Sequence, residues 1–444
     1  MKRSDMATVS TAESPQLYGD SIADFIHRSP SPYHASSSLA DLLESAGFIR
    51  LSEQDKWSLE SGGKYYVTRN DTSLIAFRCG RNPADSAGIR AIGAHLDSPC
   101  LKLAPDPVLK RHGYRQLNVE VYGSPLLRTW FDRDLSIAGR IFFDDGASGI
   151  RKCLIHKADP LAVIPSIAIH LERDANVRQE VDSQAHLNPV IADDVDSLEA
   201  FLSVGEDLTE SGYDSQRLLG HDLSLYDVNP PERLGTDGLL ISSARIDNLL
   251  SCHAGAIAIA EAQTDNFCLL VCSDHEEVGS MSDSGADGPF LASVLQRTVG
   301  LDPTVIGRSL LVSADGAHGI HPNYPHKHDE QHAPAIGGGP VIKVNANQNY
   351  ASSGESIACI RKLCESINVP HQVFISRNDI RCGTTIGPIV ASEIGIPTVD
   401  IGVAQFAMHS IRELASVVDA LGFRKLLQAV LESEKVNQAQ WTGT

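Results

Sequence analysis

The sequence lacks the marks of several large classes of protein. Its nine cysteines include no CxxC pair, its N-terminus has no apolar segment, and no stretch approaches 18 apolar residues. These absences argue against a disulfide framework, a secretory signal and a membrane-spanning helix. Cys252, Cys268 and Cys272 lie in apolar surroundings, which is typical of reduced thiols in a reducing compartment. We therefore predict a cytoplasmic location, no membrane association and a frayed polar tail at the N-terminus.

Fingerprints of nucleotide-binding loops are also absent. The chain has no GxGxxG, and its "GTTIGP" stretch, Gly383–Pro388, lacks the GK[ST] of a phosphate-binding loop. We expect this stretch to form a tight turn that opens a helix.

What is present is the composition of a soluble globular protein. The chain has 444 residues, a length that is enough for two domains. Its residues are 42% hydrophobic and 21% charged, which is ordinary for such a protein. Lys and Arg number 37 against 56 Asp and Glu, so the formal charge is −19. Such a surface repels nucleic acid and anionic membranes, and we expect neither as a partner. An acidic ligand would need a local positive group.

Apolar strands alternate with amphipathic helices over much of the chain. This alternation predicts an α/β fold whose central sheet is mostly parallel and has helices on both faces. The predicted strands are 74–80, 89–95, 267–273, 309–315 and 396–402, and the predicted helices are 36–47, 356–368 and a long closing helix over 410–435.

The middle of the chain has a different pattern. Alternating polar and apolar residues in 116–123, 135–143 and 165–172 predict strands exposed on one face. We therefore predict a β-rich domain over residues 102–235 that is inserted between two parts of the α/β domain, residues 1–101 and 236–444. Pro and Gly in Asn229–Gly238 are typical of a return linker.

Polar residues capable of catalysis gather where these strands end. His95 and Asp97 stand two apart in "GAHLDSP", so they share one face of a strand. "CSDHEEVGS" supplies Glu276 and Glu277, although Gly279 stands where the H-E-x-x-H zinc helix needs its second histidine. The remaining candidates are Asp247, Asp315 and His409.

Each of these residues has an ordinary structural explanation. An HxD triplet is common in surface loops, and Asp247 stands where a helix N-cap is expected. Ligand sites of open α/β sheets, however, form outside the carboxyl ends of strands. Two histidines with three carboxylates also suit two zinc-type cations, because one carboxylate can bridge them, and one further carboxylate is left to act as a base. Composition and spacing leave both interpretations open.

A histidine-rich tract raises a separate question. Its spacing matches no closed zinc module, and its prolines indicate a rigid loop. We expect loop or subunit contacts from these residues, His321, His326, His328 and His332.

Seven motifs in order resemble the aspartyl aminopeptidase family of dinuclear zinc metallopeptidases. The resemblance extends from Ser29–Ala35 to the last helix. The motifs are "GAHLDSP", "RIDNL", "DHEEVGS", "SADGAHGIHPNY", "GPVIKVN", "RCGTTIGP" and "AMHSIRE".

The resemblance implies two Zn²⁺ per subunit, for which Co²⁺ or Mn²⁺ can substitute. His95 and Asp315 are expected to bind one zinc and Glu277 and His409 the other, with Asp247 between them. Asp97 is expected to orient His95, and Glu276 to act as the general base.

The resemblance also implies a zinc-exopeptidase α/β domain interrupted by a dimerisation domain, in a tetrahedral dodecamer built from dimers. His170 is expected to reach a neighbouring subunit's active site, although a histidine on a strand is more often buried or paired. The expected substrates are peptides with a free N-terminus and an acidic first residue. Lys343, in the apolar "VIKVN", is the candidate cation for that residue, unless its amine simply reaches water.

Three other functions stay open. A relative with the same metal ligands can cleave neutral, Leu-type residues. A dinuclear deacylase or carboxypeptidase would act on blocked N-termini or on C-termini. A non-catalytic assembly protein on the same scaffold is expected to lack a ligand or the base, and this chain has all of them.

Overall fold

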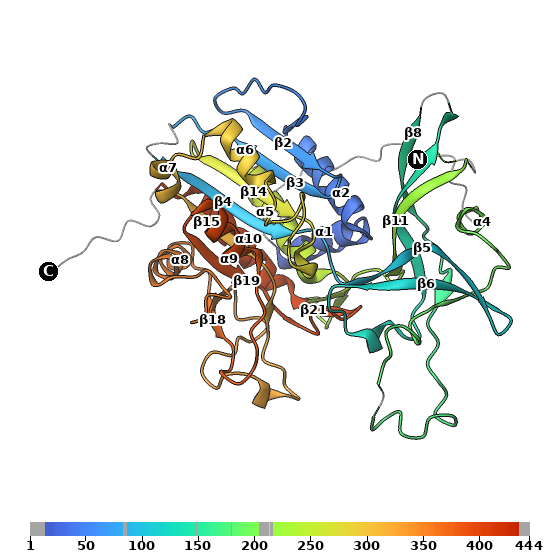
Figure 1. The fold of residues 1–444 in the computed structure, drawn as a ribbon. Coiled ribbons are helices and arrows are strands. Elements are labelled where there is room, and N and C mark those ends of the chain that lie inside the picture. Colours follow the sequence, from blue (N-terminus) through green and yellow to red (C-terminus); the bar gives the residue numbers. More distant parts are fainter. Residues whose placement is uncertain are drawn as a thin grey trace.

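The structure is a computed structural model that describes residues 14–82, 87–146, 149–178, 180–203, 213 and 216–434. The predicted N-terminal tail, residues 1–13, lies outside these ranges. Figure 1 shows a large layered body in blue, yellow and red beside a smaller green body. Both ends of the chain build the large body, and the middle of the chain builds the small one. Within the described residues, every helix falls short of the length and apolar character needed to cross a membrane.

A nine-stranded sheet forms the centre of the large body. In spatial order its strands are β1 (Ile49–Leu51), β2 (Lys64–Arg69), β3 (Ser73–Arg78), β14 (Phe267–Ser273), β4 (Ile89–His95), β15 (Leu310–Ala314), β19 (Thr398–Gly402), β17 (Val341–Val344) and β18 (Gln372–Ile375). Neighbours run parallel from β14 through β4 and β15 to β19, while β3 and the β17–β19 pair are antiparallel. The predicted α/β class with a mostly parallel sheet is confirmed.

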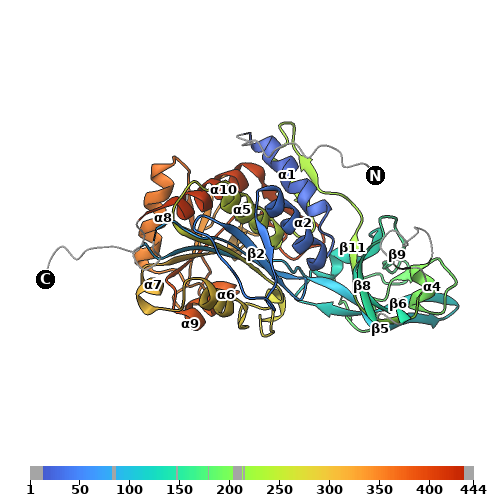
Figure 2. The same ribbon diagram turned by 90° about the horizontal axis from the view of Figure 1, so that it is seen from above.

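Helices cover both faces of this sheet (Figure 2). Alternation along β4 directs Ile92 to one face and Ala91 to the other, and each joins a separate apolar core. Pro32 and the Ser31 cap start α2 earlier than the predicted Ser36, because Pro fits the first helical turn. The first face packs against α1 (Pro15–His27), α2 (Pro32–Ser45), α5 (Ile246–Glu261), α8 (Gly354–Ser366) and α10 (Val417–Glu432), and the second against α6 (Phe290–Thr298), α7 (Pro303–Gly307) and α9 (Ile386–Ile394). Thr385 caps α9, so this stretch opens a helix as predicted, but Thr385 is extended and residues 383–385 form no tight turn.

The small body is an antiparallel sheet that closes on itself. Its order is β11 (Leu218–Asp227), β5 (Cys100–Arg111), β6 (Tyr114–Tyr122), β10 (Val190–Ile191), β9 (Ala162–Val163), β7 (Leu135–Asp144) and β8 (Ile150–His156), and β11 also pairs with β7. It has an apolar core of its own, to which the short helix α4 (Leu198–Leu202) contributes. The strand predicted over 165–172 is wrong, because no described strand pairs with these residues: 165–168 are irregular and 169–171 form a turn.

A third, five-stranded sheet connects the parts of the large body. Its order is β12 (Glu232–Leu234), β13 (Leu240–Ser243), β21 (Glu413–Ser416), β20 (Ala404–Phe406) and β16 (Ala317–His318). The prediction that one helix runs over 410–435 is therefore wrong at its start. Residues 413–416 have helical spacing but pair with β13, and α10 begins at Val417 behind a Ser416 cap.

Candidate functional site

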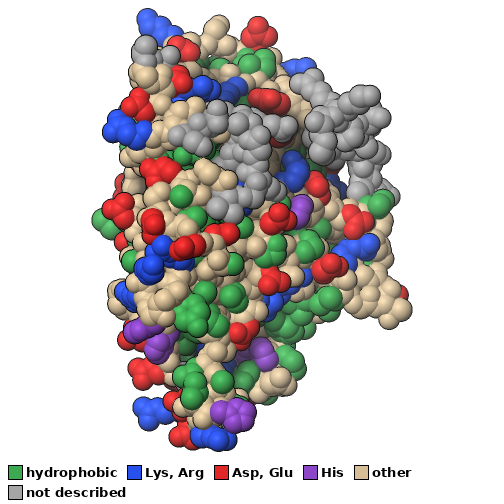
Figure 3. Space-filling model, turned by 90° about the vertical axis from the view of Figure 1, so that its right-hand side faces the viewer, with side chains coloured by type: hydrophobic (Ala, Val, Ile, Leu, Met, Phe, Trp, Pro, Cys, Tyr) green, Lys and Arg blue, Asp and Glu red, His purple; other side chains and the backbone are tan. Residues whose placement is uncertain are grey.

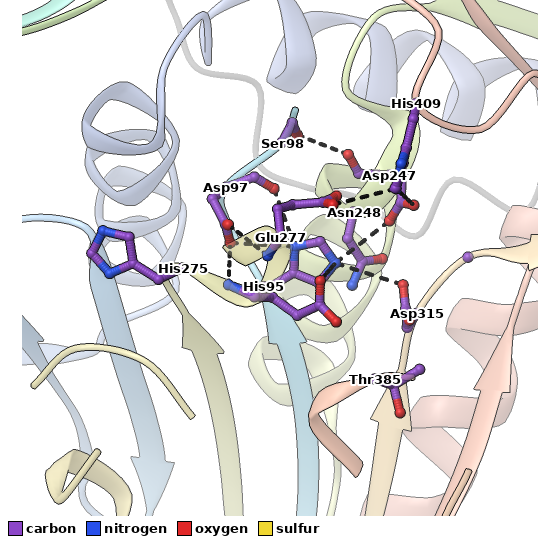
Figure 4. A network of polar contacts seen from close by, with 12 residues as sticks. His95, Asp97, Ser98, Asp247, Asn248, His275, Glu277, Asp315, Thr385 and His409 are labelled. Carbon is purple, nitrogen blue, oxygen red and sulfur yellow. Dashed lines mark hydrogen bonds and ion pairs between the residues drawn. The ribbon is translucent and has the colours of Figure 1, made fainter. Parts of the chain in front are cut away.

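The candidate residues meet at the carboxyl edge of the nine-stranded sheet. Parallel pairing of β14, β4 and β15 brings their ends together, with Ser273 beside His95. Glu276 and Glu277 follow in a short 3-10 turn, η4 (Glu276–Val278), and Asp315 follows β15. Asp247 comes from the first turn of α5, and His409 from the loop between β20 and β21. We call His95, Asp247, Glu276, Glu277, Asp315 and His409 the site cluster, most of which Figure 4 labels.

His95 is the buried centre of one half of this cluster. Its Nε2 lies 3.5 Å from Asp247 Oδ1, 3.6 Å from Asp315 Oδ1 and 3.9 Å from Glu276 Oε2. Its Nδ1 faces Asp97, 3.1 Å from the backbone oxygen and 3.4 Å from Oδ1. A histidine held at one nitrogen by such a partner presents the other nitrogen in a fixed direction.

His409 is the centre of the other half. Its Nε2 lies 3.3 Å from Glu277 Oε2 and 3.7 Å from Asp247 Oδ2. Its Nδ1 lies 3.1 Å from the backbone oxygen of Ser124, which belongs to the segment leading from β6 to β7. Asp247 therefore stands between the two histidines, with one oxygen toward each.

Asp97 fixes the backbone of the two adjacent glutamates. Its carboxylate accepts hydrogen bonds from the backbone N–H of Glu276 at 3.1 Å, from that of Glu277 at 3.0 Å and from the Tyr122 hydroxyl at 2.7 Å. Burial acts to raise the pKa of Asp97, but His95 and these donors outweigh it and leave the pKa below its usual value. Asp97 is therefore an anion with its oxygens already engaged.

Two carboxylate oxygens of the cluster are suited to a cation. Asp247 Oδ1 and Glu277 Oε1 are buried without a hydrogen-bond partner among the described residues. One ligand atom from each of His95, Asp247 and Glu277 lies within 4.8 Å of the others. Buried carboxylates without a donor are costly, and imidazole with carboxylate is a donor set that suits zinc. The residues present therefore fit a divalent metal.

The pKa values of Glu276 and Asp315 are shifted in opposite directions. Burial, together with Asp315, Asp97 and Asp247, raises the pKa of Glu276 to about 8, while His95 acts to lower it. Burial also acts to raise the pKa of Asp315, but Lys343 and His95 outweigh it and place the pKa below its usual value. Lys343 is buried and donates to Asp315 Oδ2 at 3.2 Å and to the Gly316 oxygen at 3.0 Å. The alternative in which its amine reaches water is wrong.

Other predicted residues lie elsewhere. His170 is exposed and sits in a turn, so neither a strand position nor burial applies to it. His275 turns away from the cluster in Figure 4, toward Ser282 at 2.8 Å. The histidine tract is a loop, in which His328 Nε2 accepts from the His321 N–H at 3.1 Å.

Sequence reasoning missed Glu413. Its carboxylate accepts from the backbone N–H of Asp247 at 2.9 Å and of His409 at 2.8 Å. The available signal was its place in "AMHSIRE", four residues after His409, but the predicted helix obscured it.

Comparisons with known proteins agree with this geometry. Residues 25–430 match the family model described as "Aminopeptidase I zinc metalloprotease (M18)". A "Probable M18 family aminopeptidase 2" of Pseudomonas aeruginosa (strain UCBPP-PA14) is 49% identical over 421 residues, which are 94% of this chain and 98% of the relative.

Solved structures of similar proteins lead to the same family. The crystal structure of prApe1 has a TM-score of 0.86 at 30% identity, with 94% of each chain covered. The structure described as "S. cerevesiae mApe1 dodecamer" has a TM-score of 0.81 at 29% identity, with 93% of this chain and 95% of that chain covered. Since the family model and the Pseudomonas relative each cover most of the sequence, the chain belongs to the M18 aminopeptidases, which are zinc metalloproteases.

Proposed function

We propose that this aminopeptidase removes acidic N-terminal residues from peptides at a site for two zinc ions. The observation that carries the proposal is the position of Asp247. Its Oδ1 lies 3.5 Å from His95 Nε2 and its Oδ2 lies 3.7 Å from His409 Nε2. A carboxylate with one oxygen toward each of two ligand groups can bridge two metals.

The other ligands divide between the two histidines. His95 with Asp315 would hold one zinc and His409 with Glu277 the other, which leaves Glu276 free of metal. When bound, zinc polarises the scissile carbonyl and lowers the pKa of a nearby water.

Glu276 is suited to move the proton. Its backbone is fixed by Asp97, and its carboxylate points into the cluster, 3.9 Å from His95 Nε2. We infer that it accepts a proton from the attacking water and delivers it to the leaving amine. A substrate's free α-amine is cationic, so this carboxylate-rich site favours an unblocked N-terminus.

Acidic selectivity would come from Lys343. An ammonium group has three donors, and Asp315 and Gly316 occupy two of them. The centroid of the Tyr350 ring also lies 5.0 Å from Nζ, and we propose that a substrate carboxylate accepts from the third donor. The same contacts also favour a second candidate function, cleavage of neutral residues, because a Lys343 neutralised by Asp315 attracts an acidic side chain less strongly.

Assembly is the remaining part of the proposal. We propose a homo-oligomer, a tetrahedral dodecamer built from dimers through the inserted domain that the sequence predicts over residues 102–235. A structurally similar chain is described as a dodecamer. Ile167, Ile169 and Leu171 are exposed on the segment after β9, which extends away from its sheet in Figure 1. Figure 3 shows the face of the molecule that lies on the right in Figure 1, and hydrophobic side chains gather in its lower half. The segment after β9 extends downward in the same direction.

Exposed apolar residues of this kind are typical of a protein–protein interface, and a second copy of this chain can bury them. His170 stands among them and would then reach the neighbouring active site. Leu171→Glu is expected to lower the assembly mass, whereas His170→Ala is expected to keep the mass and lower turnover. Analytical ultracentrifugation with parallel assays checks both variants, and an unchanged mass for Leu171→Glu contradicts this interface.

One experiment tests the catalytic proposal. The zinc content of the purified protein is measured, and hydrolysis of Asp-, Glu- and Leu-peptides is followed with free and with N-acetylated termini, with and without chelator. We expect two zinc ions per chain, cleavage of free Asp- and Glu-peptides, and loss of activity on chelation. Faster cleavage of Leu-peptides would favour the neutral-residue function, and cleavage of acetylated peptides would refute an aminopeptidase.

A further inference from the structure

The strongest feature outside the proposed ligand set is Glu413. It is the first residue of β21 and pairs with Ser243, the last residue of β13. Asp247 follows Ser243 by four residues, and His409 precedes Glu413 by four. The β13–β21 pairing therefore places this one side chain between two proposed zinc ligands that are far apart in the sequence.

The Glu413 carboxylate joins these two ligands. Oε2 accepts from the Asp247 N–H at 2.9 Å and Oε1 from the His409 N–H at 2.8 Å. The side chain is 2% exposed, so water does not compete for these bonds. Each oxygen is paired with one ligand residue, which couples the position of one to that of the other.

Regular secondary structure does not fix either ligand. Asp247 has φ −78° and ψ 110°, which is outside the helical range although it lies in the first turn of α5. His409 has φ 66°, a left-handed conformation that is unfavourable for a residue with a side chain. Both backbones therefore depend on outside hydrogen bonds, and Glu413 supplies one to each.

We propose that Glu413 is a positioning residue that sets the separation of Asp247 and His409 and thereby the affinity of the site for its second zinc. This inference rests on the proposed function. A carboxylate suits the role because it offers two acceptors to two N–H donors. Its negative charge is costly beside other carboxylates, which argues for a role beyond packing.

The test compares Glu413→Gln with a matched control. Gln keeps the shape but presents an NH₂ group to one of the two N–H donors. Asp419 is the control, because it is also buried and accepts from two backbone N–H groups, those of Gly337 and Gly339, away from the site cluster. Asp419→Asn is expected to lower the melting temperature without changing zinc binding.

Zinc affinity is measured by titrating metal-free protein against a chromophoric chelator, and the Co²⁺-loaded protein provides an absorption spectrum. In Glu413→Gln we expect the weaker zinc to bind about 10- to 100-fold less tightly, with an altered Co²⁺ spectrum. Wild-type affinity and spectrum, with only a lowered melting temperature, would overturn the inference.

Two further outcomes are informative. If Glu413→Gln does not fold, Glu413→Asp keeps the charge but withdraws it by one methylene, and wild-type zinc affinity in that variant also overturns the role. A wild-type protein that binds a single zinc would overturn the proposed dinuclear site. Unchanged affinity for that ion in Glu413→Gln would then overturn the positioning role as well.

Discussion

Glu276 and Glu277 are adjacent in the chain but have different surroundings. Glu277 lies 3.3 Å from His409, and its buried Oε1 has no hydrogen-bond partner among the residues that the structure describes, which suits a metal ligand. Glu276 lies beside His95 and Asp315, and its pKa is raised to about 8 mainly by burial. The same local turn therefore presents two carboxylates in different surroundings, which suits the roles we propose, Glu277 as a metal ligand and Glu276 as the base.

Replacing Glu276 by Gln tests its proposed role as the base. The variant keeps the shape but cannot accept a proton, so we expect wild-type zinc content and a fall in kcat of about 100-fold or more. Metal analysis and steady-state kinetics check it. Glu277→Gln is the matched variant and is expected to lose zinc instead. Near-normal kcat in Glu276→Gln would rule out its role as base.

Lys343→Met is the second prediction. Met fills the buried space of the stem without the charge, so KM for Asp- and Glu-peptides should rise far more than KM for Leu-peptides. Kinetics on the three substrates, with zinc content as the control, check this. A drop in zinc content with equal losses on all substrates would instead make Lys343 a support for Asp315, which it contacts at 3.2 Å.

Strand β19 passes very close to the chain segment that follows β15 and contains Asp315. A Cβ added at Gly402, the last residue of β19, would lie 1.7 Å from the Asp315 backbone oxygen. Only glycine allows β19 to pass this close to the chain that follows β15. In contrast, a Cβ at Gly422 within α10 would meet Val369 at 3.4 Å, an ordinary contact.

Substitution by alanine is expected to have opposite effects at these two glycines. Gly402→Ala must displace Asp315, so we expect unfolding free energy to fall by about 1–3 kcal/mol and zinc to bind more weakly. Gly422→Ala improves the helix propensity of α10 and should stabilise by about 0.5–1 kcal/mol. Urea denaturation and zinc titration check both. A Gly402→Ala protein with wild-type zinc affinity would show that Asp315 tolerates the shift.

Lys343 pairs with Asp315, and metal cations or protons can neutralise the remaining carboxylates of the site cluster. Without metal, burial and neighbouring carboxylates raise the pKa of Glu276 from 4.5 to about 8. The folded state then keeps a proton that the unfolded chain releases. Stability from this group is therefore present below pH 4.5 and is lost as pH rises toward 8.

We predict that chelated protein loses unfolding free energy between pH 4.5 and 8, whereas zinc-loaded protein does not, because zinc binds the deprotonated ligands. Denaturation at fixed protein concentration across this range checks it. Glu276→Gln, which cannot titrate, should reduce the slope in the metal-free form. A metal-free protein that gains stability over the same range would contradict the prediction.

The local sequence pattern was enough to predict those elements whose structure depends mainly on their own residues. β4 (Ile89–His95) and β14 (Phe267–Ser273) were predicted with their observed bounds, because each is an apolar run with a polar residue at its end. The candidate ligands could be named for the same reason, as polar residues that follow buried strands. The resemblance to a known family then assigned their roles.

Contacts between distant segments decided the rest. Helical spacing in 410–435 concealed β21, because the pairing with β13 outweighs local preference. Alternation in 165–172 indicated a strand, but none of the strands that the structure describes pairs with this segment. Glu413 gained its position in the same way, through a ladder that joins residues far apart in the chain.

The sequence by itself therefore determined which side chains are available and the α/β class, because periodicity and residue type are local properties. Only the tertiary structure decided that Asp247 stands between His95 and His409, that Lys343 faces Asp315 and that Glu413 links the backbones of two proposed ligands. These are distances between side chains, and they exist only after the sheets have brought remote segments together.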